Sequence, residues 1–167
     1  MICWDRCGDE IVGYFDDSEI EVLRAYAESL ILLLDRRAAS YRSLGRVRVP
    51  GEATTDPRVL ALLRAELGPG EPDWVLASQE SSCLARVAGQ VRDHLATLPE
   101  SGGVVRLTSE QSSPWRRVLS WYLAVIDAVT DGEGRDARQI VEPTVGWLTE
   151  IASGLDSLGH GHGGRHR

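Results

Sequence analysis

Apolar residues recur three or four positions apart along most of the chain, the spacing that places them on one face of an α-helix. The clearest example lies in residues 18–39, whose stripe comprises Ile20, Leu23, Ala27, Leu30, Ile31 and Leu34. The same spacing predicts further helices over residues 56–67, 74–98, 109–130 and 136–158. Since most of these helices have a single apolar face to bury, we predict a mainly α fold with about five helices in one bundle-like domain, residues 1–158.

Capping residues mark where several of these helices begin. Ser18 with Glu21, and Thr108 with Gln111, have the spacing of a capping box, in which two side chains satisfy backbone N–H groups of the first turn. Asp73 is expected to cap the helix that follows it, because a carboxylate accepts from the first free N–H groups. These signals predict three of the helix starts.

The two ends of the chain differ from its helical centre. Residues 2–7 and 10–15 are rich in β-prone side chains on either side of a Gly-Asp turn, which predicts a short N-terminal hairpin over residues 2–15. Residues 104–107 predict a further short extended segment. The tail of Gly, His and Arg at 159–167 lacks apolar residues that could pack, and we expect it to be disordered.

Composition excludes several classes of chemistry. The chain has 167 residues and a net charge of −7, and all 18 of its basic residues are Arg. The absence of Lys excludes a Walker-type phosphate loop and Schiff-base catalysis. The absence of Asn excludes N-glycosylation and a Cys-His-Asn triad. The excess of acid argues against binding of nucleic acid over the whole surface.

Charge is distributed unevenly over the first third of the chain. Residues 1–35 contain nine acidic residues and two Arg. The next sixteen residues contain no acid and five basic residues, and residues 40–55 are predicted to form an Arg-rich loop. Because an Arg side chain binds phosphate or carboxylate with two parallel hydrogen bonds, this cluster is a candidate contact for a partner or a phosphate: Arg36, Arg37, Arg42, Arg46 and Arg48. Pairing with the acidic segment of the same chain is the alternative.

Trp121 is a second candidate contact. Trp115, Leu119 and Tyr122 already define the inner face of its predicted helix, so the Trp121 ring is expected on another side. An exposed Trp is typical of a protein interface, and the hypothesis therefore depends on whether the ring is exposed. Core packing is the alternative.

The Cys and His residues do not form a recognisable site. Cys3, Cys7 and Cys83 are few and lack a framework spacing, which indicates reduced thiols in the cytoplasm. His94 is expected at a helix C-terminus, where a cation is favourable, and the other three His lie in the tail. We expect no cofactor, no metal site and no membrane segment, with loose metal binding by the tail as the alternative.

Three segments carry a family resemblance: residues 17–23 after the hairpin, residues 56–60, and residues 105–111 leading to Trp115, with the later Val145-Gly146-Trp147-Leu148. In their order and spacing they resemble an actinobacterial family of uncharacterised proteins, often encoded beside the Clp protease adaptor. The resemblance implies no established activity, although some members are labelled transcriptional regulators.

Three hypotheses of function follow from these observations. The first is a non-enzymatic, cytoplasmic domain that binds a protein, or itself, and regulates. The second is a nucleic-acid-binding transcriptional regulator that uses the Arg-rich loop, which predicts steeply salt-dependent binding. The third is a small enzyme with an unrecognised site.

Overall fold

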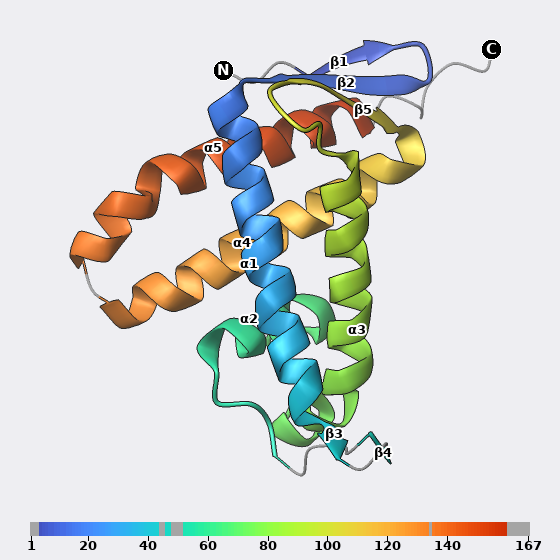
Figure 1. The fold of residues 1–167 in the computed structure, drawn as a ribbon. Helices are drawn as coiled ribbons and strands as arrows, with labels where there is room; N and C mark the ends of the chain where they lie inside the picture. Colours follow the sequence, from blue (N-terminus) through green and yellow to red (C-terminus); the bar gives the residue numbers. More distant parts are fainter. Residues whose placement is uncertain (1–3, 44–45, 48–51, 134, 160–167) are drawn as a thin grey trace, which may run out of the picture.

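Five α-helices carry most of the chain, as predicted. The computed structural model describes residues 4–43, 46–47, 52–133 and 135–159. The helices are α1 Asp17–Ser40, α2 Pro57–Leu67, α3 Asp73–Thr97, α4 Ser109–Glu133 and α5 Arg135–Gly159. The fold is therefore mainly α, with a small antiparallel sheet at one end (Figure 1).

Helix α1 buries the predicted stripe but begins at a different cap. Its buried residues are Ile20, Leu23, Ala27, Leu30 and Leu34. Asp16, rather than Ser18, is the N-cap, and it forms the capping box with Glu19. The Asp16 carboxylate accepts from the Glu19 backbone N–H at 2.9 Å, and the Ser18 hydroxyl donates to the same carboxylate. The predicted box was wrong because Asp16 reaches the first-turn N–H groups ahead of Ser18.

Of the two other predicted helix caps, one is confirmed and one is wrong. The Thr108–Gln111 box is confirmed, since Thr108 N–H donates to the Gln111 side chain and Gln111 N–H donates to the Thr108 hydroxyl. Asp73 is not a cap. It lies in the first turn of α3, after Pro72, whose φ of −68° and ψ of 153° lead the chain into the helix without a side-chain cap.

The N-terminal hairpin is confirmed in its described part, and the segment at 104–107 adds a third strand to it. Strands β1 (Trp4–Cys7) and β2 (Glu10–Phe15) pair antiparallel. Strand β5 (Gly103–Thr108) pairs with the other edge of β2, with Leu107 opposite Ile11. The sequence predicted the extended segment but not its partner, because a pairing across nearly a hundred residues is decided by packing.

The predicted loop over 40–55 begins one residue later than expected and contains two short strands. Helix α1 continues to Ser40, so Arg36 and Arg37 belong to its last turns. Two short strands, β3 (Arg42–Ser43) and β4 (Arg46–Val47), then pair antiparallel. The predicted tail begins with Gly159, which is the last residue of α5, and its remainder lies outside the described residues.

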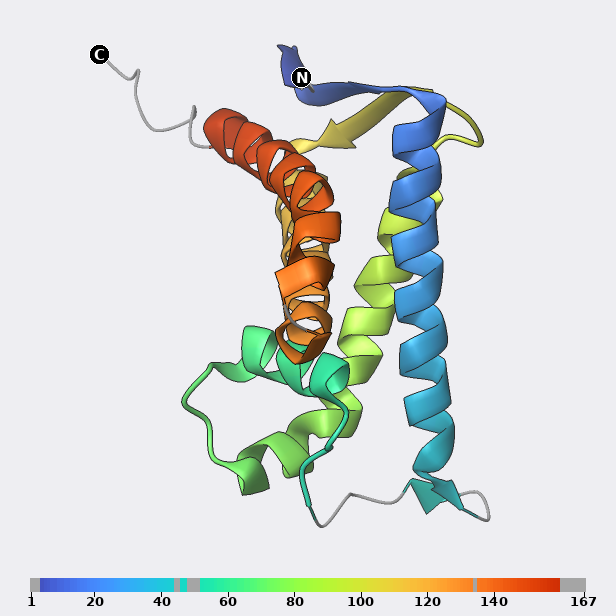
Figure 2. The same ribbon diagram turned by 90° about the vertical axis from the view of Figure 1, so that its left-hand side faces the viewer.

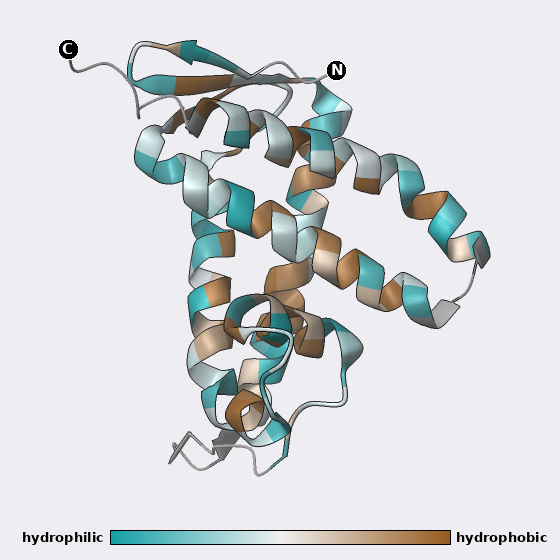
Figure 3. Ribbon diagram, turned by 180° about the vertical axis from the view of Figure 1, so that it is seen from behind, coloured by the Kyte–Doolittle hydropathy of each residue, from teal (hydrophilic) through white to brown (hydrophobic). Residues whose placement is uncertain are grey.

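The helices enclose one continuous core beneath the sheet. α1 and α3 run side by side, and α4 and α5 run antiparallel across them (Figures 1 and 2). Trp4 of the sheet packs edge-on against Phe15 and Trp115, at centroid distances of 5.5 and 5.8 Å. The adjoining parts of α4 and α5 extend to one side of α1 and α3 (Figure 1), and we call residues 123–133 and 135–149 the α4–α5 arm. Ile126 and Leu148 of this arm still belong to the core. Hydrophobic residues recur along the arm out to its end (Figure 3).

Candidate functional site

A groove follows α1 from Tyr26 to Ser40, and we call it the α1 groove. It consists of two adjoining hollows, of about 270 Å³ and about 490 Å³, that share Ser29, Leu33 and Arg58. The smaller hollow lies between α1 and the base of the α4–α5 arm, and the larger one lies between α1 and the start of α2. The two ends of the groove differ in chemistry.

The end beside the arm is apolar. Its floor is Tyr122, whose ring stacks on that of Tyr26 at a centroid distance of 5.6 Å and an interplanar angle of 28°. Most of the wall is aliphatic, formed by Leu30, Leu33, Val125, Ile126, Val129 and Val141, and Ser29, Arg58 and Thr130 complete it. Val129 is partly exposed at the rim. This end is therefore a concave, largely apolar surface.

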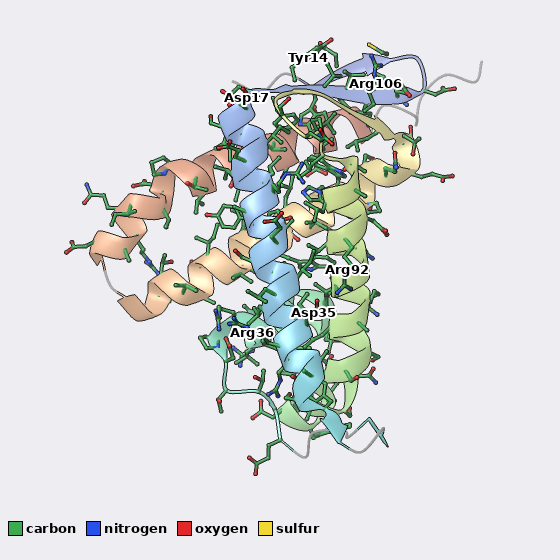
Figure 4. All side chains as sticks on the ribbon, viewed as in Figure 1. Tyr14, Asp17, Asp35, Arg36, Arg92 and Arg106 are labelled. Atoms are coloured by element: carbon green, nitrogen blue, oxygen red, sulfur yellow. The ribbon has the colours of Figure 1, made fainter. Side chains whose placement is uncertain are left out.

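The other end is lined by three Arg residues in different states. Arg58 is paired with Asp56, its Nη2 lying 2.8 Å from a carboxylate oxygen, and this pair lowers the pKa of Asp56. Arg36 is exposed and forms no ion pair within the described part of the chain. Figure 4 places Arg36 on the side of α1 that faces α2, whereas Asp35 lies on the α3 side beside Arg92. Arg36 is thus a cation available to an acidic ligand.

Arg37 is engaged by a buried carboxylate. Glu80 of α3 is fully buried, and its Oε1 accepts from Arg37 Nε at 2.6 Å and from the Tyr41 hydroxyl. The Arg37 guanidinium also lies over the Tyr41 ring, 5.1 Å from its centroid. Burial and the hydrogen bond to Glu80 raise the pKa of Tyr41. Arg37 therefore holds the C-terminal end of α1 on α3.

The five Arg residues that the sequence predicted as one cluster do not share one environment in the structure. Arg37 pairs within the chain, but with Glu80 rather than with the acidic segment 1–35. Arg42 lies in β3 and Arg46 in β4, and their side chains are outside the described part. Arg48 lies outside the described residues. Of the five predicted contacts, the structure thus places Arg36 and Arg37 at the α1 groove.

The hypothesis that Trp121 is an interface residue required an exposed ring, and in the single chain the ring is buried. Its side chain is 0% exposed, and its Nε1 donates to Glu66 of α2 at 3.0 Å. Helix α4 is covered on this side by α2 as well as on its predicted inner face, which a single apolar stripe does not reveal. The exposed indole is Trp74, at 73%, near the start of α3. Nothing in the sequence around Trp74 indicated this exposure.

His94 and Cys83 are core residues. His94 lies in the last turn of α3, as predicted, but the expectation of a cation there was wrong. Its ring is buried against Trp115, at a centroid distance of 4.2 Å, and burial lowers its pKa to about 3. Neither ring nitrogen has a hydrogen-bond partner within the described chain. Burial also raises the pKa of the Cys83 thiol to about 11, which keeps it protonated. Neither group resembles an activated catalytic residue.

Two further observations concern metals and membranes. Across the ranges that the structure describes, no three His, Cys, Asp or Glu side chains are gathered closely enough to hold a metal ion. Among the helices so described, none combines the length and the apolar character needed to cross a bilayer.

The fold and the groove define a mainly α domain with a small terminal sheet and a concave face along its first helix. The chain belongs to the family described as a domain of unknown function, DUF2017, whose model matches residues 1–150. No curated protein matches the chain. No solved structure matches it either.

Proposed function

We propose that this chain is a non-enzymatic, cytoplasmic regulatory domain that binds a helical segment of a partner protein in the α1 groove. The observation that carries the proposal is the joining of an apolar hollow to an unpaired cation, Arg36, along one face of α1. The actinobacterial origin and the place beside the Clp adaptor that the sequence resemblance implies belong to the same proposal.

The dimensions of the groove favour a peptide helix. From Tyr26 to Arg36, α1 rises about 15 Å at 1.5 Å per residue, which corresponds to nearly three turns of a partner helix. The apolar hollow, of about 270 Å³, continues into the hollow of about 490 Å³, so the groove is elongated along α1. It suits the side chains of a docked helix, in which apolar residues three and four positions apart enter one groove.

Charge complementarity specifies the partner segment further. Apolar side chains would pack on Leu33 and Val129, which are accessible at the rim of the apolar end. An acidic side chain about one turn further along the groove than Leu33 would meet Arg36, whose planar fork matches a carboxylate. We therefore expect an amphipathic helix whose apolar stripe ends beside Asp or Glu.

The proposal is tested by affinity capture from native lysate with variants that differ only at the groove. Leu33→Asp places a charge in the apolar end, and Arg36→Glu reverses the free cation. Val22→Asp and Arg64→Glu are the matched controls, because both residues are exposed and neither lines the α1 groove. Like Arg36, Arg64 forms no ion pair within the described residues. Circular dichroism of each variant checks that the fold is intact.

The expected result is a protein that the wild-type chain and both controls retain and that both groove variants lose. A set of captured proteins that is identical for all five chains would contradict the proposal. Recovery of nucleic acid instead, lost in Arg36→Glu and at high salt, would favour the second hypothesis from the sequence.

A further inference from the structure

A further hollow, of about 780 Å³, lies on another side of α4 and shares no lining residue with the α1 groove. Four polar residues of α4 line it, at positions i, i+3, i+4 and i+7 of one helix face: Ser113, Arg116, Arg117 and Ser120. Arg86 reaches it from α3. Three guanidinium groups from two helices therefore converge on one concave surface.

Two alanines and a hydrogen-bonded glutamate on the neighbouring helices leave this hollow unfilled. Ala65 of α2 and Ala152 of α5 line it, where longer side chains would fill the space. Glu66 of α2 has a side chain only 7% exposed, and both of its oxygens are engaged. One accepts from Trp121 Nε1 at 3.0 Å and the other from Arg86 Nη2 at 3.0 Å. Arg86 is thus held in place from the core.

The charges in the hollow do not balance. Arg86 is paired with Glu66, and Arg116 is paired with Asp156. Arg117 is exposed and has no ion pair among the residues that the structure describes. Three Arg and two carboxylates line the hollow, which leaves one positive charge in excess within a chain of net charge −7. Each paired Arg also retains unused N–H donors, since a guanidinium has five.

We propose that this hollow binds the phosphate group of a small phosphate monoester. A phosphate presents more acceptor oxygens than a carboxylate, and donors from Arg86, Arg116 and Arg117 approach from two helices. Ser113 adds a hydroxyl with no hydrogen bond inside the described part of the chain, whereas the Ser120 hydroxyl donates to the Arg117 carbonyl. Leu123 and the two alanines provide an apolar wall for the rest of the ligand.

Isothermal titration calorimetry with phenyl phosphate tests the proposal on the full chain. Phenyl phosphate combines a phosphate monoester with a small apolar body. Phenylacetate carries a carboxylate on a similar body, and inorganic phosphate has no body at all. We expect phenyl phosphate to bind more tightly than phenylacetate by about tenfold or more, because one additional charge-assisted hydrogen bond has about that effect. Binding of inorganic phosphate as tight as that of the ester would assign the site to free phosphate.

Variants separate a built site from general attraction of anions. Arg117→Gln removes the unpaired guanidinium and breaks no ion pair within the described chain. Arg138→Gln, on the α4–α5 arm, makes the same change of charge outside the hollow. We expect Arg117→Gln to weaken binding of phenyl phosphate about tenfold and Arg138→Gln to leave it within twofold. No binding at millimolar ligand, equal binding of phenylacetate, or equal effects of the two substitutions would overturn the proposal.

Discussion

Arg37 and Glu80 form an ion pair between the last turns of α1 and the first half of α3, with 2.6 Å between Arg37 Nε and Glu80 Oε1. The Glu80 side chain is fully buried and the Arg37 side chain is 29% exposed. Arg36, the preceding residue, also lines the α1 groove but forms no ion pair among the described residues. Of these two adjacent arginines, Arg37 stabilises the packing of α1 on α3, and Arg36 is the unpaired cation of the candidate binding surface.

This difference predicts that the same substitution lowers stability strongly at Arg37 and hardly at all at Arg36. Arg37→Gln leaves the Glu80 carboxylate buried without its cation, and breaking a buried pair in this way costs about 3 kcal/mol of unfolding free energy. Arg36→Gln breaks no contact of this kind and should change it by less than about 0.5 kcal/mol. Urea denaturation of the two variants measures both values. Equal stabilities would show that the Glu80 contact is not a determinant of the fold.

Two buried tyrosines predict effects of opposite sign. The Tyr41 hydroxyl donates to Glu80, so Tyr41→Phe should destabilise the chain by about 1–2 kcal/mol. The Tyr122 hydroxyl is buried and has no hydrogen-bond partner within the described residues, so Tyr122→Phe should raise stability by about 1 kcal/mol. Thermal melts of both variants against the wild type test this. A loss of stability in Tyr122→Phe would indicate a partner for that hydroxyl.

His94 predicts a dependence of stability on pH. Its pKa is about 3 in the folded chain and 6.5 as the unperturbed value, so below pH 6.5 the unfolded chain binds a proton that the folded chain does not. The contribution of neutral His94 to the free energy of unfolding is therefore fully present above pH 6.5. It falls by up to about 1.4 kcal/mol per pH unit as the pH decreases toward 3. His94→Leu should remove this part of the slope between pH 6.5 and 5. An unchanged slope in that variant would contradict the buried, neutral state of His94.

Trp4 is confined by two glycines. A Cβ at Gly154 of α5 would lie 2.7 Å from Trp4 Cδ1, and one at Gly13 would lie 2.5 Å from Trp4 Cζ3. Gly154→Ala should lower stability by about 1–3 kcal/mol, because overpacking outweighs the helix propensity of Ala. Gly146→Ala, on the same helix with nothing within 4 Å, should raise stability by up to about 1 kcal/mol. Chemical denaturation compares the two, and a stabilising Gly154→Ala would contradict the Trp4 contact.

The helices could be predicted because their signals are local. The stripe of α1 and the capping box of Thr108 and Gln111 depend on residues within one or two turns of each other. The pairing of β2 with β5 could not be predicted, since nothing in either segment identifies a partner so distant in sequence. Neither could the core position of Trp121, because α2 covers a face of α4 that the apolar stripe leaves out.

The candidate site was predictable only in part, for the same reason. Clustering of Arg36 and Arg37 was visible in the sequence, but the buried partner of Arg37 lies 43 residues away on α3. The apolar half of the α1 groove arises where α1 meets the α4–α5 arm, which sequence periodicity does not show. The face formed by Ser113, Arg116, Arg117 and Ser120 had a readable helical spacing, but the hollow in front of it depends on Ala65 and Ala152.

The central claim, that the α1 groove binds a partner helix, is tested most directly by site-specific photo-crosslinking. A photoreactive amino acid at Leu33 lies in the apolar end of the groove, and one at Val22 lies on α1 outside it. After irradiation in native lysate, mass spectrometry identifies the crosslinked peptides. We predict one partner segment joined to position 33 and absent at position 22, with apolar residues three and four apart followed by an acidic residue. No crosslink at position 33, or the same crosslinks at both positions, would contradict the account.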